Sequence, residues 1–269
     1  MKSRSAVAMV ALAILVLGVP VSAQDETTPV AFDGIGFAFG PDLGASVAST
    51  RVPGQSVPSE PVSFAPDAAH VTFTLYGAAR EGRRPPRIGW SESTVRAYRI
   101  ADLADHEGAS AQVAALQGLL ADPDSLPGFM EIRDDGGDPL PHLPVDTAAA
   151  QAIRARVAMF DTATLEGIAY VVGYRQDVSA FAAGDFWYTF QALSKDGAWY
   201  VSGDFVVEAP GFPEQVRPRD QRGIDRRWER YLADSVSSLN AATPDAFSPS
   251  LASIDALIES ITLPTATTS

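Results

Sequence analysis

Three histidines are the first candidates for acid–base or metal chemistry, because histidine titrates near neutral pH and is a common metal ligand. They are His70, His106 and His142, and their spacing is not the short helical spacing of zinc hydrolases. We expect His70 to be an ordinary surface or edge residue at a strand start, and His106 to belong to a solvated cluster at a helix entry. His142 lies in an irregular loop, where functional residues are common, so it is the best of the three for lining a cleft.

Other chemical motifs are scarce. The chain has no cysteine, which excludes thiolate catalysis, cysteine-based metal sites, disulfides and the lipid-modified cysteine of bacterial lipoproteins. It has no Gly-x-Ser-x-Gly nucleophile elbow. The stretch from Asp134 to Asp138 is rich in Asp and Gly but does not match a calcium-binding loop, so a solvated turn is favoured and weak calcium binding stays open. We therefore predict no catalytic residue, no metal site and no cofactor.

The charge of the chain argues against two classes of partner. The formal net charge is −13, and removal of a leader that carries Lys2 and Arg4 makes it −15. Such a surface repels phosphate backbones and anionic lipids, so we expect no nucleic acid as a partner. Arginines cluster locally between Arg217 and Arg230 and could bind an anion. Because acids alternate with them on what looks like a helix, an ion-paired, solvated face is the favoured interpretation.

The N-terminus predicts export. Lys2 and Arg4 precede an apolar run of 14 residues that ends before Pro20, and Val21-Ser22-Ala23 offers small residues at the usual cleavage spacing. The run is shorter than the roughly 20 residues of a membrane-spanning helix. We predict a signal peptide at 1–23, a flexible lead-in at 24–32, one domain at 33–262 and a disordered tail at 263–269. After cleavage the protein would be secreted, extracellular or in the cell envelope, with no stable membrane anchor.

Hydrophobic periodicity predicts an α+β fold. Alternating patterns indicate strands at 33–39, 71–75, 94–100, 156–160 and 168–174, and apolar residues at helical spacing indicate helices at 108–121, 224–239 and 251–261. Asp146 looks like the N-cap of a further short, Ala-rich helix that leads into Ile153. Strands joined as hairpins, with single helices between them, favour a mostly antiparallel sheet covered by amphipathic helices. The sequence leaves open whether the sandwich has two layers or three.

A hairpin over 185–208 should be central to the core. Asp196-Gly197 marks its tight turn, and taking these two residues as the loop pairs Phe190 with Gly203 and Tyr188 with Phe205. That register gathers apolar and aromatic residues on one face, whereas a shift of one residue would set Tyr188 opposite Asp204. The other face is mixed. Its Trp187, Tyr200 and Asp204 could hold a sugar or a peptide, but we expect a helix to cover them.

The segment Tyr188-Thr189-Phe190-Gln191-Ala192-Leu193-Ser194-Lys195-Asp196-Gly197-Ala198-Trp199-Tyr200-Val201 resembles a YTFQGLTxDGxYYV-like pattern in uncharacterised secreted bacterial proteins, a family of unknown function. Two further stretches are similar to the same group, namely 36–39 with its Pro-rich crossing and 140–144. These residues are strand and turn positions. The resemblance implies an exported globular module and supplies no catalytic residue. A looser similarity, at the level of the fold alone, is to the PsbP-type α/β/α sandwich, which is mostly a non-enzymatic accessory module.

Two functional hypotheses remain. The first is a secreted, non-enzymatic binding or accessory module of the cell envelope, whose partner is an unknown protein or small-molecule ligand. The second is a cofactor-free secreted hydrolase that uses Asp and Glu carboxylates, with His142 as a further candidate. A pocket with two facing carboxylates would favour the hydrolase.

Overall fold

A large antiparallel sheet organises the molecule. The computed structural model of the chain describes residues 27–56, 67–77, 92–126, 139–145 and 149–264. Seven strands form the sheet in the order β3-β4-β5-β9-β8-β7-β6, and a separate hairpin joins β1 and β2. The strands are β1 Thr28–Phe32, β2 Ile35–Phe39, β3 Ser46–Val52, β4 His70–Tyr76, β5 Ser93–Arg99, β6 Ala150–Asp161, β7 Leu165–Arg175, β8 Phe186–Ser194 and β9 Trp199–Val207.

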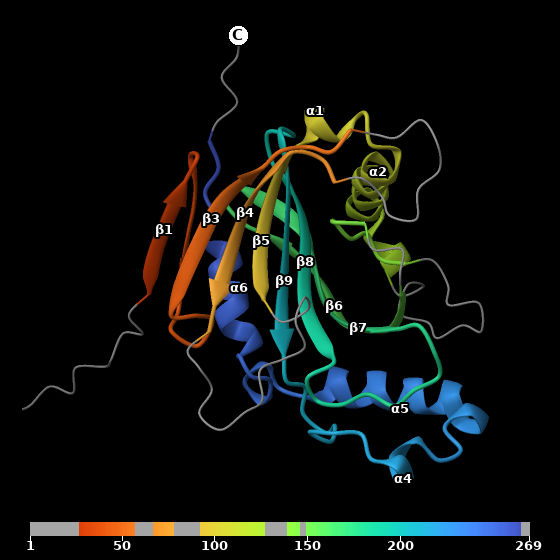
Figure 1. Cartoon of the computed structure of the whole chain (residues 1–269). Coiled ribbons are helices and arrows are strands. Elements are labelled where there is room, and N and C mark those ends of the chain that lie inside the picture. Colours follow the sequence, from red (N-terminus) through yellow and green to blue (C-terminus); the bar gives the residue numbers. More distant parts are fainter. Residues whose placement is uncertain (1–26, 57–66, 78–91, 127–138, 146–148, 265–269) are drawn as a thin grey trace, which may run out of the picture.

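Helices lie on both faces of this sheet (Figure 1). The α-helices are α1 Ile100–Leu103, α2 Glu107–Ala121, α4 Pro218–Gln221, α5 Trp228–Ala241 and α6 Leu251–Glu259, and short 3-10 turns lie at Pro123–Ser125, Asp225–Arg227 and Pro244–Ala246. None of the helices within the described ranges is long and apolar enough to cross a membrane. The fold is therefore α+β with a hairpin-built sheet, as the sequence predicts.

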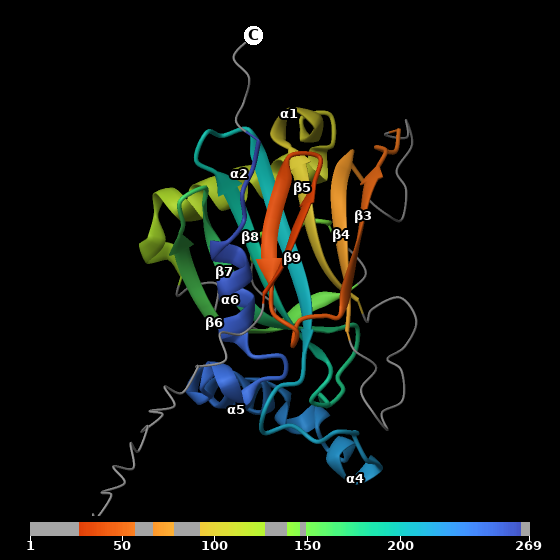
Figure 2. The same cartoon turned by 90° about the vertical axis from the view of Figure 1, so that its left-hand side faces the viewer.

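Two separate cores show that the sandwich has three layers. On one face of the sheet, which we call the α6 face, Phe73, Phe190 and Phe205 pack with α5, α6 and the β1–β2 hairpin. On the opposite face, the α2 face, Tyr170 and Tyr200 pack with the apolar side of α2. Figure 2 shows the same arrangement from the side of the β1–β2 hairpin. The number of layers, which the sequence left open, follows from this double burial.

The central hairpin has the register that burial predicted. Phe190 lies opposite Gly203, and Tyr188 lies opposite Phe205. The turn is longer than the expected two-residue loop, because β8 ends at Ser194 and β9 begins only at Trp199. Within this loop only Gly197 has a positive φ, of 71°. Bonds from the Ser194 side chain hold the longer loop: its hydroxyl accepts from the backbone N–H groups of Ala198 and Trp199.

Residues 28–32 correct the predicted flexible lead-in. They form β1, in which Val30 lies opposite Phe37, and Val30 and Phe32 pack on the core of the α6 face. The two-residue turn Asp33-Gly34 has φ values of 57° and 81°, as a type I′ hairpin requires. The Asp-Gly pair is typical of such a turn, and the prediction of a flexible lead-in did not take it into account. At the other end, the predicted tail boundary at 263 is also too early, because Leu263 still packs on this core.

Two predicted helices are wrong in part. Ala150 to Ile153, expected at the end of an Ala-rich helix, are the first residues of β6, since pairing with β7 outweighs the helix propensity of alanine; Asp146 lies outside the described residues. The long C-terminal helix begins at Trp228 rather than at Ile224. The arginine cluster consequently spans α4, a loop, a 3-10 turn and the start of α5 instead of one helix face.

Candidate functional site

The α2 face of the sheet carries a row of polar side chains. Strand alternation sends every second residue of β5, β8 and β9 to this face. Arg96 lies opposite Ser202, which in turn lies opposite Gln191, and the neighbouring row joins Thr94, Asp204 and Thr189 across the same three strands. The result is a polar strip inside a face that is otherwise covered by apolar packing.

His142 and Arg96 both bind Asp204 within this strip. The His142 Nε2 atom lies 2.9 Å from Asp204 Oδ1, and the Arg96 Nη1 atom lies 2.9 Å from Asp204 Oδ2. The three side chains are 14–21% exposed, so the ion pairs are largely shielded from water. Asp204 therefore bridges two positively charged groups.

The contacts of His142 favour its doubly protonated form. Its Nδ1 atom lies 2.9 Å from the carbonyl oxygen of Pro144, and its Nε2 atom faces the Asp204 carboxylate. Both partners only accept hydrogen bonds, so both ring nitrogens must donate. Burial alone would lower the pKa of His142, but the Asp204 charge and these hydrogen bonds raise it above its usual value. Likewise burial would raise the pKa of Asp204, but His142 and Arg96 together lower it.

The loop that carries His142 is fastened to the sheet and to α2. The backbone N–H of Leu143 donates to Gln191 Oε1 at 2.9 Å, and the Tyr170 hydroxyl donates to the carbonyl of Pro141 at 2.9 Å. The backbone N–H of His142 donates to Gln112 of α2 at 3.0 Å. The sequence singled out His142 as a cleft residue. The structure instead makes its ring part of the packing between this loop and the sheet.

The other predicted residues do not join this site. His70 is buried rather than a surface residue: its ring lies against Tyr98 at 4.7 Å between centroids, and its Nδ1 atom is 2.8 Å from the carbonyl of Ala68. His106 is at the N-cap of α2, in agreement with the expected helix entry. No group of three or more metal-ligating side chains occurs in the described part of the chain, and Asp134 to Asp138 lie outside it.

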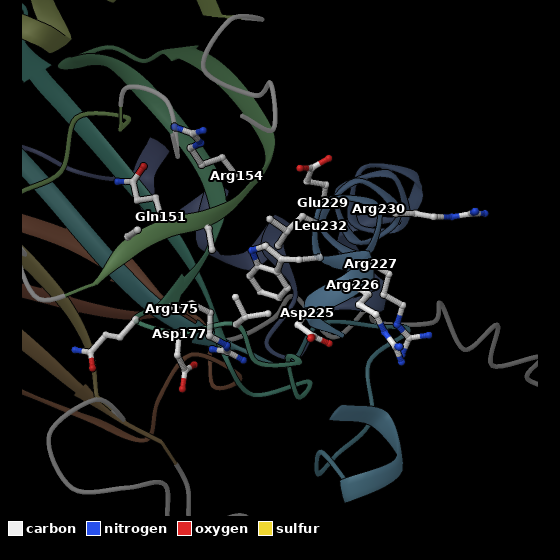
Figure 3. A pocket seen from close by; sticks show the side chains of 15 residues that line it. Gln151, Arg154, Arg175, Asp177, Asp225, Arg226, Arg227, Glu229, Arg230 and Leu232 are labelled. Atoms are coloured by element: carbon white, nitrogen blue, oxygen red, sulfur yellow. The ribbon is translucent and has the colours of Figure 1, made fainter. Parts of the chain in front are cut away.

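A groove at the far edge of the sheet is open to solvent. It has a volume of about 700 Å³ and lies between the start of β6, the end of β7 and the N-terminal part of α5 (Figure 3). Its lining residues are Ala150, Gln151, Ala152, Arg154, Arg175, Gln176, Asp177, Val178, Asp225, Arg226, Arg227, Trp228, Glu229, Arg230 and Leu232.

Aromatic stacking fixes one wall of the groove. Trp228 stacks on Tyr231 with 5.7 Å between ring centroids, and Tyr231 stacks on Phe181 at 6.4 Å. The guanidinium of Arg175 lies 3.6 Å above the Phe181 ring and binds Asp185 at 2.6 Å. Arg175 thus stabilises the fold, and the Asp185 carboxylate neutralises its charge.

Two other arginines of the groove are not neutralised in this way. The side chains of Arg226 and Arg227 are exposed and have no ion pair or hydrogen bond to any residue within the described ranges. Figure 3 shows both extending to the same side of the groove, whereas Arg230 points away from it and pairs with Asp234 at 3.6 Å. The sequence favoured an ion-paired helix face for the whole cluster. At Arg226 and Arg227 that interpretation is wrong, because they lie in the 3-10 turn before α5, where neither forms an ion pair within the described ranges.

Sequence reasoning missed the role of Arg96. Its signal was the alternation of Thr94, Arg96 and Tyr98 in one strand, which places a charge on a face that the other strands bury.

No protein-family model matches this chain. A search of curated proteins gives no match either.

Proposed function

We propose that this protein is an exported, non-enzymatic binding module, and that the groove at the end of α5 binds an anionic ligand. The observation that carries the proposal is the pair Arg226 and Arg227, exposed at a concave surface without a counter-ion among the described residues. In a chain with net charge −13, two arginines left unpaired beside a groove form a local site for negative charge.

The lining argues for carboxylates rather than for a dense polyphosphate. Asp177, Asp225 and Glu229 share the groove with the arginines, so closely spaced negative charges along a ligand would also meet repulsion. An acidic peptide segment with separated carboxylates fits such a mixed surface better. Trp228 adds an aromatic surface for the aliphatic part of the ligand. We do not propose nucleic acid as a partner, because the net charge of the chain is −13.

The geometry at His142 favours binding over the hydrolase alternative. A general base needs a ring nitrogen that can accept a proton, and both nitrogens of His142 donate to protein acceptors. Asp204 is held as a carboxylate by two cations, so it is not poised as a general acid. The His142–Asp204 pair therefore holds the loop on the sheet, whereas the groove is open to solvent.

A screen of the mature chain from Gln24 tests the functional class. Acidic and neutral peptides and glycans would be assayed both for a thermal shift and for turnover. The proposal predicts stabilisation by acidic members and no product from any member, because the groove binds ligand without reacting. Turnover of any member would show that the protein is an enzyme. Stabilisation by neutral members alone would contradict the proposal that the ligand is anionic.

A further inference from the structure

Three buried hydroxyl groups surround Arg96 on the α2 face of the sheet. Thr72 lies directly opposite Arg96 on β4, Ser202 lies opposite it on β9, and Thr94 precedes it by two residues on β5. The hydroxyl oxygens of all three are buried and have no hydrogen-bond partner in the described part of the protein. Thr94 is only 7% exposed, and Ser202 is fully buried.

Such a concentration is unusual. Buried polar side chains nearly always have a hydrogen-bond partner, and the exceptions point to a bound molecule or to ordered water. On the neighbouring strands other polar groups of this face are satisfied: the Tyr200 hydroxyl donates to Gln191 Oε1 at 2.8 Å, and Gln191 Nε2 donates to Thr189 at 3.0 Å. The hydroxyl of Tyr98, the next residue of β5 on this face, is also buried without a hydrogen-bond partner in the described part of the protein. The hydroxyls of Thr72, Thr94 and Ser202 are the ones that lie around Arg96.

Arg96 itself has binding capacity left. Its Nη1 atom binds Asp204, and no hydrogen bond to its Nε or Nη2 atoms occurs within the described ranges. A guanidinium presents a planar fork of N–H donors that suits a carboxylate. His142 and Arg96 carry two positive charges against the single charge of Asp204, so one positive charge remains at this point of the sheet.

We propose that Thr72, Thr94, Arg96 and Ser202, here called the Arg96 site, bind a small carboxylate. The ligand oxygens would accept from the free edge of the Arg96 guanidinium and from the three hydroxyls. Acetate and lactate are small probes of this class, and their carboxylate matches the planar fork of a guanidinium. Arg96 is 21% exposed, which leaves a way in from solvent.

The Arg96 site is separate from the groove. It is built on β4, β5 and β9, whereas the groove is lined from β6, β7 and α5. The strands β8 and β7 lie between β9 and β6 in the sheet. The Arg96 site and the groove therefore have no lining residue in common.

Thermal melts of the mature protein test the proposal with sodium acetate and sodium L-lactate as probes, against sodium chloride at equal ionic strength. The proposal predicts a saturable rise in melting temperature with a carboxylate and none with chloride. If the carboxylates act no differently from chloride, the hydroxyls hold ordered water only and the proposal is overturned.

Thr94→Val and Ser202→Ala locate the response without breaking the Arg96 ion pair. Each removes an unpaired hydroxyl, so the free variant should melt at the wild-type temperature or above, while its affinity for the carboxylate falls at least tenfold. Thr28→Val is the control, because Thr28 lies on β1, which is not part of the seven-stranded sheet that carries the Arg96 site. Equal loss in the control would contradict the site. A response lost in Arg226→Gln/Arg227→Gln but kept in Thr94→Val would assign the carboxylate to the groove.

Discussion

At the scale of single residues, His142 makes the stability of the fold depend on pH. Its pKa lies above the usual 6.5 and that of Asp204 lies below the usual 3.8. Protonated His142 contributes its full stabilisation below pH 6.5 and loses it as the pH rises through its raised pKa. Ionised Asp204 contributes above pH 3.8 and loses it as the pH falls through its lowered pKa. The ion pair therefore stabilises the fold most between pH 3.8 and pH 6.5.

Replacement of His142 by glutamine tests this assignment. Between pH 4 and 6.5 the variant should be less stable than the wild type by about 1 kcal/mol or more, and the difference should shrink as the pH rises above 6.5. Urea unfolding across this range measures it. In an Asp204→Asn background the pH dependence of the difference should vanish. A difference that stays constant from pH 4 to pH 9 would mean that folding does not shift the pKa of His142.

Gly203 is required by the ring that lies across it. A Cβ atom at this position would come within 2.2 Å of the Phe190 ring, and Phe190 is fully buried. We expect Gly203→Ala to destabilise the fold by about 1–3 kcal/mol through overpacking. Gly184→Ala is the control, because nothing lies within 4 Å of the added atom. Equal stability of the two variants in urea unfolding would contradict the tight packing of this hairpin.

At the scale of elements, Arg156 joins β6 to the end of α5. Its backbone N–H donates to Asn240 Oδ1 at 2.6 Å, and its guanidinium binds the carbonyl oxygens of Leu239 and Ala242. These are among the last carbonyls of a helix, which have no partner inside the helix. The residue also has a φ of 54°, in the left-handed region that costs a non-glycine residue energy.

Two substitutions at Arg156 separate these effects. Both Arg156→Ala and Arg156→Gly lose the guanidinium contacts, but glycine accepts the positive φ without strain. We expect both to be less stable than the wild type, with the glycine variant about 1 kcal/mol more stable than the alanine variant. Thermal and urea unfolding would show this order. A glycine variant less stable than the alanine variant would contradict the left-handed backbone.

The elements also show where sequence reasoning works. The β8–β9 register was predictable because a shift of one residue would have set Tyr188 opposite Asp204 and broken up the apolar pairs that gather on one face. The turn of the β1–β2 hairpin is also encoded locally, by Asp33-Gly34. The alternating pattern of 33–39 predicts only one strand, which begins at this turn. The strand at Ala150 to Ile153 could not be predicted from the local sequence. Its alanines are extended because they pair with β7, and nothing within 150–153 itself indicates that pairing.

At the scale of the whole molecule, the acidic surface should weaken the fold at low salt. A net charge of −13 for the full chain, or −15 without its predicted leader, repels itself in the compact state. Raising NaCl from about 0.02 M to about 0.2 M should therefore raise the melting temperature by a few degrees. A melting temperature that falls over this range would mean that surface ion pairs outweigh the repulsion.

The site could be predicted only in pieces. His142 and Asp204 were both recognised in the sequence, but 62 residues separate them and 108 separate Arg96 from Asp204. Only the order of strands in the sheet brings them together. Likewise the freedom of Arg226 and Arg227 depends on where α5 begins, and helix ends are poorly determined by local sequence.

Calorimetric titration of the mature protein with a hexapeptide that alternates Glu and Gly tests the proposed binding of an acidic peptide to the groove most directly. The hexapeptide that alternates Gln and Gly is the neutral ligand control. We predict binding of the acidic peptide alone, weakened at least tenfold in Arg226→Gln/Arg227→Gln, which corresponds to about 1.4 kcal/mol. Arg217→Gln/Arg222→Gln removes the same charge from the same cluster outside the groove and should bind as the wild type does. Equal affinity in all three proteins, or equal binding of both peptides, would contradict the account.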